Sequence, residues 1–175
     1  MNLDELLQYA GNPAVTFVVG GICGFLGTRF TMSAAERKNY KQTQYENALK
    51  HKKAKEERFV AFTRAMRDYV NKGGPPSLDE FHSISTSGDL YFSELRIIAD
   101  AILDGNVDPG SRDRTFVPDL VRAVQKTIPS YYETLGRIAS QMGVEYGGAF
   151  QRADYESVFQ AVEKYAPKEM LRPTY

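Results

Sequence analysis

Charged residues are missing from the chain between Leu6 and Thr28. Residues 9–28 supply the roughly 20 residues that a helix needs to cross the hydrocarbon core of a membrane. Pro13 and several glycines lower the hydrophobicity of this run, but both residue types are more frequent in membrane helices than in soluble ones. We therefore predict a transmembrane anchor, with its short N-terminal flank, in residues 1–32.

Two other interpretations of this segment stay open. A cleaved signal peptide has a basic region before its apolar run, whereas this run follows Asp4 and Glu5, and its best cleavage site, Ser33-Ala34-Ala35, lies beyond Arg29. A buried helix of a soluble domain normally has a polar face, which residues 13–28 lack. A membrane span fits the pattern better than either.

Residues 33–70 have a different pattern, because they contain no Pro or Gly and are rich in Ala, Lys, Glu, Gln and Arg, which favour helices. They predict one long, basic helical stalk. An apolar seam on the second half of this helix consists of Phe59, Phe62, Met66 and Val70. The seam is too short for a coiled coil, which needs three or four heptads.

Amphipathic helices dominate the rest of the chain. The sequence Asn71-Lys-Gly-Gly-Pro-Pro76 ends the stalk and predicts a linker in residues 71–76, after which Ser77 and Glu80 have the spacing of a capping box. Apolar residues then recur on one helical face in residues 89–104, 115–128, 129–142 and 154–165. The predicted fold class is all-α: an anchor, a stalk, a compact helical bundle in residues 77–166 and a C-terminal tail in residues 167–175.

Charge is distributed unevenly along the 175 residues, although the formal net charge is zero. Residues 29–67 carry 11 basic and 4 acidic residues, and residues 68–175 carry 11 basic and 16 acidic residues. Basic residues next to a span are retained on the cytoplasmic side. We expect a single-pass membrane protein with the bulk of the chain in the cytoplasm.

Two sets of residues are candidates for membrane contacts. Gly20, Gly24 and Thr28 form a small-residue stripe that favours packing between membrane helices, and hence a homo-oligomer. Basic residues after the span are candidates for contact with anionic membrane lipids, the alternative being a solvated helix face: Arg29, Arg37, Lys38, Lys41, Lys50, Lys52, Lys53 and Lys55. Nucleic acid is not an expected partner, because the domain that follows is acidic and no recognition fold is apparent.

Metal and cofactor chemistry finds little support in the sequence. Cys23 is the only cysteine, which excludes an intrachain disulfide and a cysteine-based zinc site. The loop Asp104–Thr115 begins like a calcium-binding loop, but Pro109 and Thr115 stand where Gly and a bidentate Glu are needed. The other candidate ligand group, Asp79, Glu80 and His82, is also explained by acidic residues at a helix start. We expect no metal and no cofactor.

Catalytic residues are not evident either. His82, Asp89 and the serines at 83, 85 and 87 have the residue types of a hydrolytic triad, but they crowd one short run without a nucleophile elbow. Four tyrosines are candidates for an interaction surface, the alternative being half-buried core residues: Tyr131, Tyr132, Tyr146 and Tyr155.

The sequence thus favours a non-enzymatic, membrane-tethered helical interaction module or scaffold at the cytoplasmic face, with an unknown protein partner. An alternative follows from the Gly20 and Gly24 stripe alone. In that alternative the protein is an oligomerising membrane-acting effector in host defence, phage exclusion or toxicity.

Overall fold

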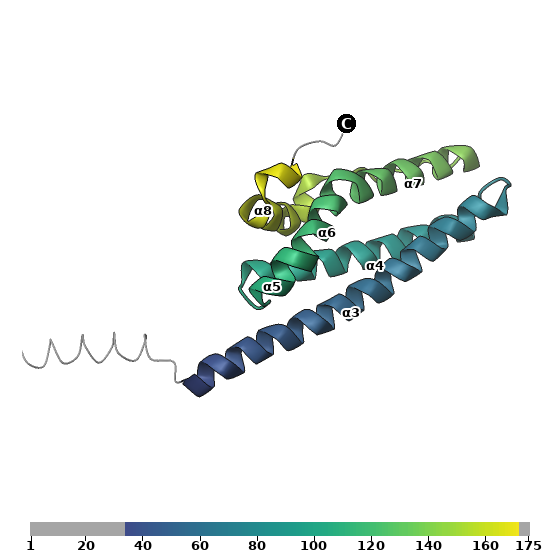
Figure 1. The fold of residues 1–175 in the computed structure, drawn as a ribbon. Helices are drawn as coiled ribbons and strands as arrows, with labels where there is room; N and C mark the ends of the chain where they lie inside the picture. The colour runs from purple at the N-terminus through teal and green to yellow at the C-terminus, as the bar shows by residue number, and fades with distance from the viewer. Residues whose placement is uncertain (1–33, 172–175) are drawn as a thin grey trace, which may run out of the picture. The chain divides into compact units, whose positions relative to one another are not determined.

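A computed structural model describes residues 34–171 (Figure 1). Every regular element in this range is helical, which confirms the all-α class. Among the described helices, none is both long and apolar enough to cross a membrane. The predicted anchor lies outside the described residues, and with it Gly20, Gly24, Thr28 and Arg29.

The chain divides into two units between Gln42 and Thr43. Helix α3 (Ala34–Lys72) contributes to both. Arg37, Lys38 and Lys41 are exposed helical residues of the first unit. The second unit contains all the features described below.

The C-terminal part of α3 belongs to the helical bundle, whereas the sequence predicted a stalk up to residue 70. Ala48, Lys55 and Phe62 are buried, and their seven-residue spacing places them on one helical face. The ring of Phe62 packs against those of Phe92 and Tyr131, with centroids 5.7 and 5.9 Å away. Residues 73–77 connect α3 to the next helix, so the linker predicted in residues 71–76 overlaps this connection, and its first two residues belong to α3.

Helix α4 (Leu78–Leu103) runs antiparallel to α3. Three polar contacts fix this pairing, between Lys72 and Glu80 (3.0 Å), His51 and Glu94 (3.2 Å), and the Gln44 side chain and the Gly105 carbonyl (2.6 Å).

The predicted capping box at the start of α4 is confirmed. The Ser77 amide donates to Glu80 Oε2 at 2.7 Å, and the Glu80 amide donates to Ser77 Oγ at 3.3 Å. The bond from the Ser77 amide and the contact with Lys72 lower the pKa of Glu80. The helix predicted from residue 89 is therefore the continuation of one that begins at Leu78.

Residues Pro109–Met142 form a nearly continuous helical path of five segments: α5 (Pro109–Ser111), η1 (Arg112–Phe116), α6 (Val117–Arg122), η2 (Ala123–Thr127) and α7 (Ile128–Met142). Both η1 and η2 are π-helical, and each is followed within two residues by a proline, Pro118 or Pro129. A proline lacks the N–H of a helix interior and its ring crowds the carbonyl four residues earlier. The wider π turn relieves this crowding, so the chain passes through Pro129 where the sequence predicted two separate helices.

The last helical elements complete the bundle. A short 3-10 segment, η3 (Arg152–Tyr155), leads into α8 (Glu156–Tyr165), which packs against α4 and α6. These two elements occupy the range predicted for the last helix. The predicted tail contains one more 3-10 turn, η4 (Lys168–Leu171).

Candidate docking groove

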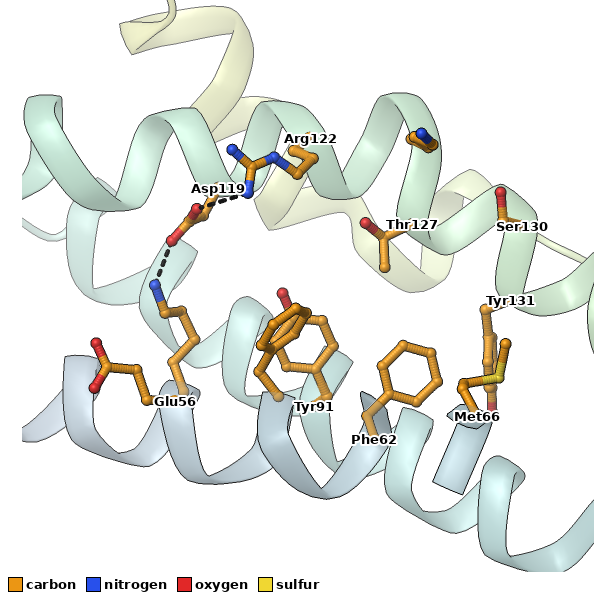
Figure 2. A pocket seen from close by; sticks show the side chains of 12 residues that line it. Glu56, Phe62, Met66, Tyr91, Asp119, Arg122, Thr127, Ser130 and Tyr131 are labelled. Atoms are coloured by element: carbon orange, nitrogen blue, oxygen red, sulfur yellow. Dashed lines mark hydrogen bonds and ion pairs between the residues drawn. The ribbon is translucent and has the colours of Figure 1, made fainter. Parts of the chain in front are cut away.

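A groove with a volume of about 450 Å³ opens between α3 on one side and α6, η2 and α7 on the other (Figure 2). We call it the α3–α7 groove. Its lining residues are Lys55, Glu56, Phe59, Phe62, Met66, Tyr91, Asp119, Arg122, Lys126, Thr127, Ser130 and Tyr131. This volume lies in the usual range of ligand sites, roughly 300–1,000 Å³.

The floor of the groove is apolar and largely aromatic. Phe59 and Met66 line it from α3, and Tyr91 lines it from α4. The Phe59 side chain rests against the Tyr91 ring, with centroids 5.4 Å apart, yet Phe59 remains 43% exposed. A large aromatic side chain that is supported on one side and open on the other is typical of an interaction surface.

Charged side chains surround this floor, and one of them is buried. Lys55 is only 8% exposed, and its ammonium forms an ion pair with Asp119 of α6 (Figure 2). The pair joins residues 64 positions apart in the chain and closes one end of the groove. Burial removes Lys55 from the predicted lipid-contact residues, whereas Lys50, Lys52 and Lys53 are exposed on α3.

The wall formed by α6 and η2 is cationic. The guanidinium of Arg122 lies 3.9 Å from the Asp119 carboxylate, whose charge is already balanced by Lys55. The Arg122 side chain is 73% exposed. Lys126 is exposed and forms no ion pair within the described residues. The π segment η2 also brings Thr127 to the groove, and π segments inside helices occur frequently at functional sites.

Burial at the groove floor raises the pKa of Tyr91 to about 12, with a further contribution from the negative charge of Asp119. The unfolded chain loses the same proton near pH 10. We therefore expect the free energy of unfolding to fall as the pH rises from about 10 to about 12, because only the unfolded state gains from ionising. The Tyr91→Phe variant should show a shallower fall in urea denaturation across this range. An unchanged slope would contradict the burial of Tyr91.

Some of the residues that the sequence offered for catalysis lie together, but within the described residues no hydrogen bond joins His82 to a serine. His82 lines a separate surface depression on α4 together with Asp79, Ser83 and Ser87, whereas His51 contacts Glu94. Ser87 donates to the Ser83 carbonyl at 2.7 Å, and Asp89 accepts a hydrogen bond from the Tyr131 hydroxyl.

Metal ligation is not seen in the described range, where no group of three or more His, Cys, Asp or Glu side chains is placed to hold an ion. In the candidate calcium loop, Asp108 instead caps the start of α5, accepting from the Ser111 amide at 2.9 Å. Arg112 and Asp113 pair with each other at 2.7 Å.

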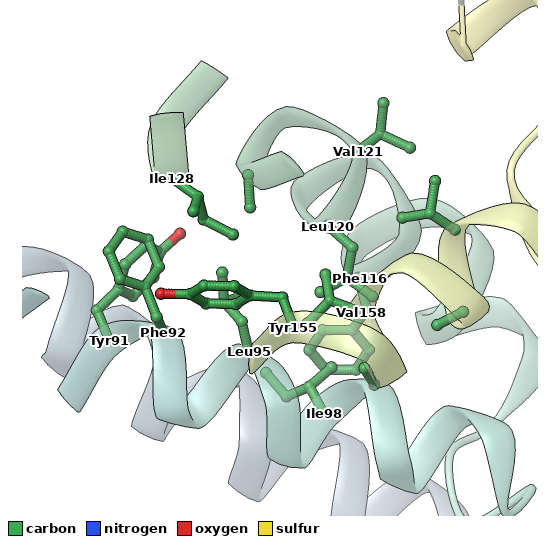
Figure 3. Packing of buried hydrophobic residues seen from close by; sticks show 14 of the residues in the cluster. Tyr91, Phe92, Leu95, Ile98, Phe116, Leu120, Val121, Ile128, Tyr155 and Val158 are labelled. Atoms are coloured by element: carbon green, nitrogen blue, oxygen red, sulfur yellow. The ribbon is translucent and has the colours of Figure 1, made fainter. Parts of the chain in front are cut away.

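The tyrosines proposed as an interaction surface contribute mostly to the core. Tyr131 is 2% exposed and donates to the Ser85 carbonyl at 3.0 Å, and Tyr155 is 4% exposed. Figure 3 shows Tyr155 among Phe92, Leu95 and other core side chains. The hydroxyls of Tyr132 and Tyr155 lie 3.0 Å apart, and burial raises the pKa of Tyr155 and of Tyr131.

Comparisons with models of known protein families, with curated proteins and with solved structures found no match.

Proposed function

We propose that the protein is a non-enzymatic docking module, held at the cytoplasmic face of a membrane by an anchor in residues 1–32, and that the α3–α7 groove receives a protein partner. The observation that carries the proposal is the half-exposed Phe59 on the floor of a groove with a cationic wall. The anchor rests on the uncharged run from Leu6 to Thr28 and the basic residues that follow it.

The lining of the groove favours binding over catalysis. It contains no histidine or cysteine, and its most buried charged group, Lys55, is neutralised by Asp119. A general base or nucleophile needs a partner that activates it, and Thr127 and Ser130 line the groove without a histidine beside them. Aromatic residues in an open concave surface instead supply the desolvated anchor of a protein interface.

Co-purification of the full chain tests the docking function. Phe59→Ser should reduce recovery of the partner by about tenfold or more, because hot-spot aromatic residues contribute at least about 2 kcal/mol. Val60→Ser is the matched control: Val60 is 53% exposed on the same helix but does not line the groove. Equal recovery with both variants would contradict the proposal.

Membrane fractionation tests the anchor. The full chain should stay with the membrane fraction in high salt, because burial of a whole span is much stronger than screened attraction to lipid charges. Deletion of residues 1–32 should release a folded helical domain, since its buried core residues begin at Ala48. Release of the full chain by salt alone would show that the segment is not a span.

A further inference from the structure

The shape of the α3–α7 groove restricts what can fill it. Its two walls are helical, and α4 contributes Tyr91 at its base (Figure 2). Along α3 the lining runs from Lys55 to Met66, which corresponds to about 16 Å of helix. A third helix of about three turns matches this length.

The charged residues that line the groove favour an occupant with negative charge. Residues 68–175 are acidic in sum, with 16 acidic and 11 basic residues. The exposed charges on the α6 and η2 wall are positive, because Asp119 is paired with the buried Lys55 while the side chains of Arg122 and Lys126 are exposed. On the α3 side the groove is also lined by Glu56, which lies 4.0 Å from Lys52. Complementary charge improves both the rate and the specificity of association.

We propose that the α3–α7 groove binds an amphipathic helix of a partner protein, with apolar side chains seated on Phe59 and Met66 and with carboxylates that pair with Arg122 and Lys126. This inference rests on the docking function proposed above. A helix satisfies its own backbone hydrogen bonds, so it can lie in a groove that offers mainly apolar side chains and presents its anchors at i, i+3, i+4 and i+7.

A small amphiphile fits the groove less well. Sites for small ligands usually bury about 70–90% of the ligand surface. The α3–α7 groove leaves Phe59 on its floor 43% exposed and Arg122 on its wall 73% exposed. An amphipathic helix covers both residues, because its apolar face packs on Phe59 while the carboxylates beside that face reach Arg122.

Two synthetic helical peptides provide the probe. They share one leucine stripe at i, i+3, i+4 and i+7 and differ only in the residues that flank it, glutamate in one and lysine in the other. Fluorescence polarisation would measure their binding to the full chain in lipid nanodiscs. The glutamate peptide should bind at least about tenfold more tightly than the lysine peptide, and Phe59→Ser should weaken it about tenfold or more.

Charge reversal distinguishes direct pairing from general attraction. Lys126→Glu breaks no ion pair of the described structure, so it should leave the fold intact and remove the preference for the glutamate peptide. The double variant with Lys126→Glu and Arg122→Gln should bind the lysine peptide more tightly than the glutamate peptide. The control is Arg137→Glu, an exposed residue of α7 that does not line the groove, which should keep the original preference.

Four results would overturn the helix proposal. One is equal binding of the two peptides, and another is an unchanged preference in the Lys126→Glu variant. The third is tight, Phe59-dependent binding of dodecanoate with no binding of either peptide, which would make the groove an amphiphile site. If neither peptide binds while a protein partner still co-purifies through Phe59, only the helical occupant is rejected and the docking function stands.

Discussion

Replacing Gly88 by alanine is expected to lower the free energy of unfolding by about 2 kcal/mol, within the range for overpacked cores. Gly88 is buried in α4, and a Cβ atom there would lie 2.3 Å from Cε2 of Tyr131. The ring cannot yield easily, because Tyr131 is 2% exposed and packs against Phe62 and Phe92. Urea denaturation followed by circular dichroism measures the effect.

The same substitution at Gly136 gives the opposite expectation. Gly136 lies within α7, and an added Cβ would meet no atom within 4 Å. Alanine should therefore stabilise the protein by about 0.5–1 kcal/mol, the usual gain over glycine in a helix. Stabilisation by alanine at both positions would contradict the packing of Tyr131 on α4.

Replacing Asp119 by asparagine is expected to cost about 2–3 kcal/mol. The change leaves the Lys55 ammonium, whose side chain is 11% exposed, without its counter-charge. Removing one partner of a fully buried ion pair costs about 3–5 kcal/mol, and the 25% exposure of Asp119 reduces this figure. Thermal and urea denaturation of the full chain would measure the loss.

Two variants separate the ion pair from other effects of this substitution. Lys55→Met combined with Asp119→Asn should recover most of the loss, because no buried charge then remains unpaired. Arg122→Gln should change the free energy of unfolding by less than about 0.5 kcal/mol, since Arg122 is 73% exposed and 3.9 Å from Asp119. If Asp119→Asn cost no more than Arg122→Gln, the buried pair would not exist.

Local patterns in the sequence predicted the helices and the apolar seam on α3. Of the four seam residues, Phe59, Phe62 and Met66 line the groove, whereas Val70 is 69% exposed and does not line it. The capping box at Ser77 followed from the spacing of two residues, and the structure contains it. Periodicity identifies the buried face of a helix because that face repeats every three or four residues.

The other wall of the groove could not be predicted in this way. Lys55 sits in a lysine-rich run typical of a solvated face, but it is buried in contact with residues far along the chain, Asp119 and Phe116. The position of Lys126 and Thr127 depends on how the π segment before Pro129 turns. Such long-range pairings depend on tertiary packing, which local periodicity does not record.

The sequence did not predict that α4 is one continuous helix, and the reason is local. The run from Ser83 to Asp89 is mostly polar and resembles a loop, but two of its polar side chains form hydrogen bonds from within the helix. Ser87 bonds to the Ser83 carbonyl one turn earlier, and Asp89 accepts from Tyr131. Serine can bond back to a helix carbonyl and so be accommodated within a helix.

Site-specific photo-crosslinking in intact cells tests the docking groove most directly. A benzophenone amino acid would replace Phe59 in one version of the full chain and Val60 in another, since both side chains are about half exposed on α3. The proposal predicts that position 59 crosslinks to a partner protein, within a helical segment rich in carboxylates, and that position 60 does not. Equal labelling from both positions, or crosslinks from position 59 to lipid alone, would contradict it.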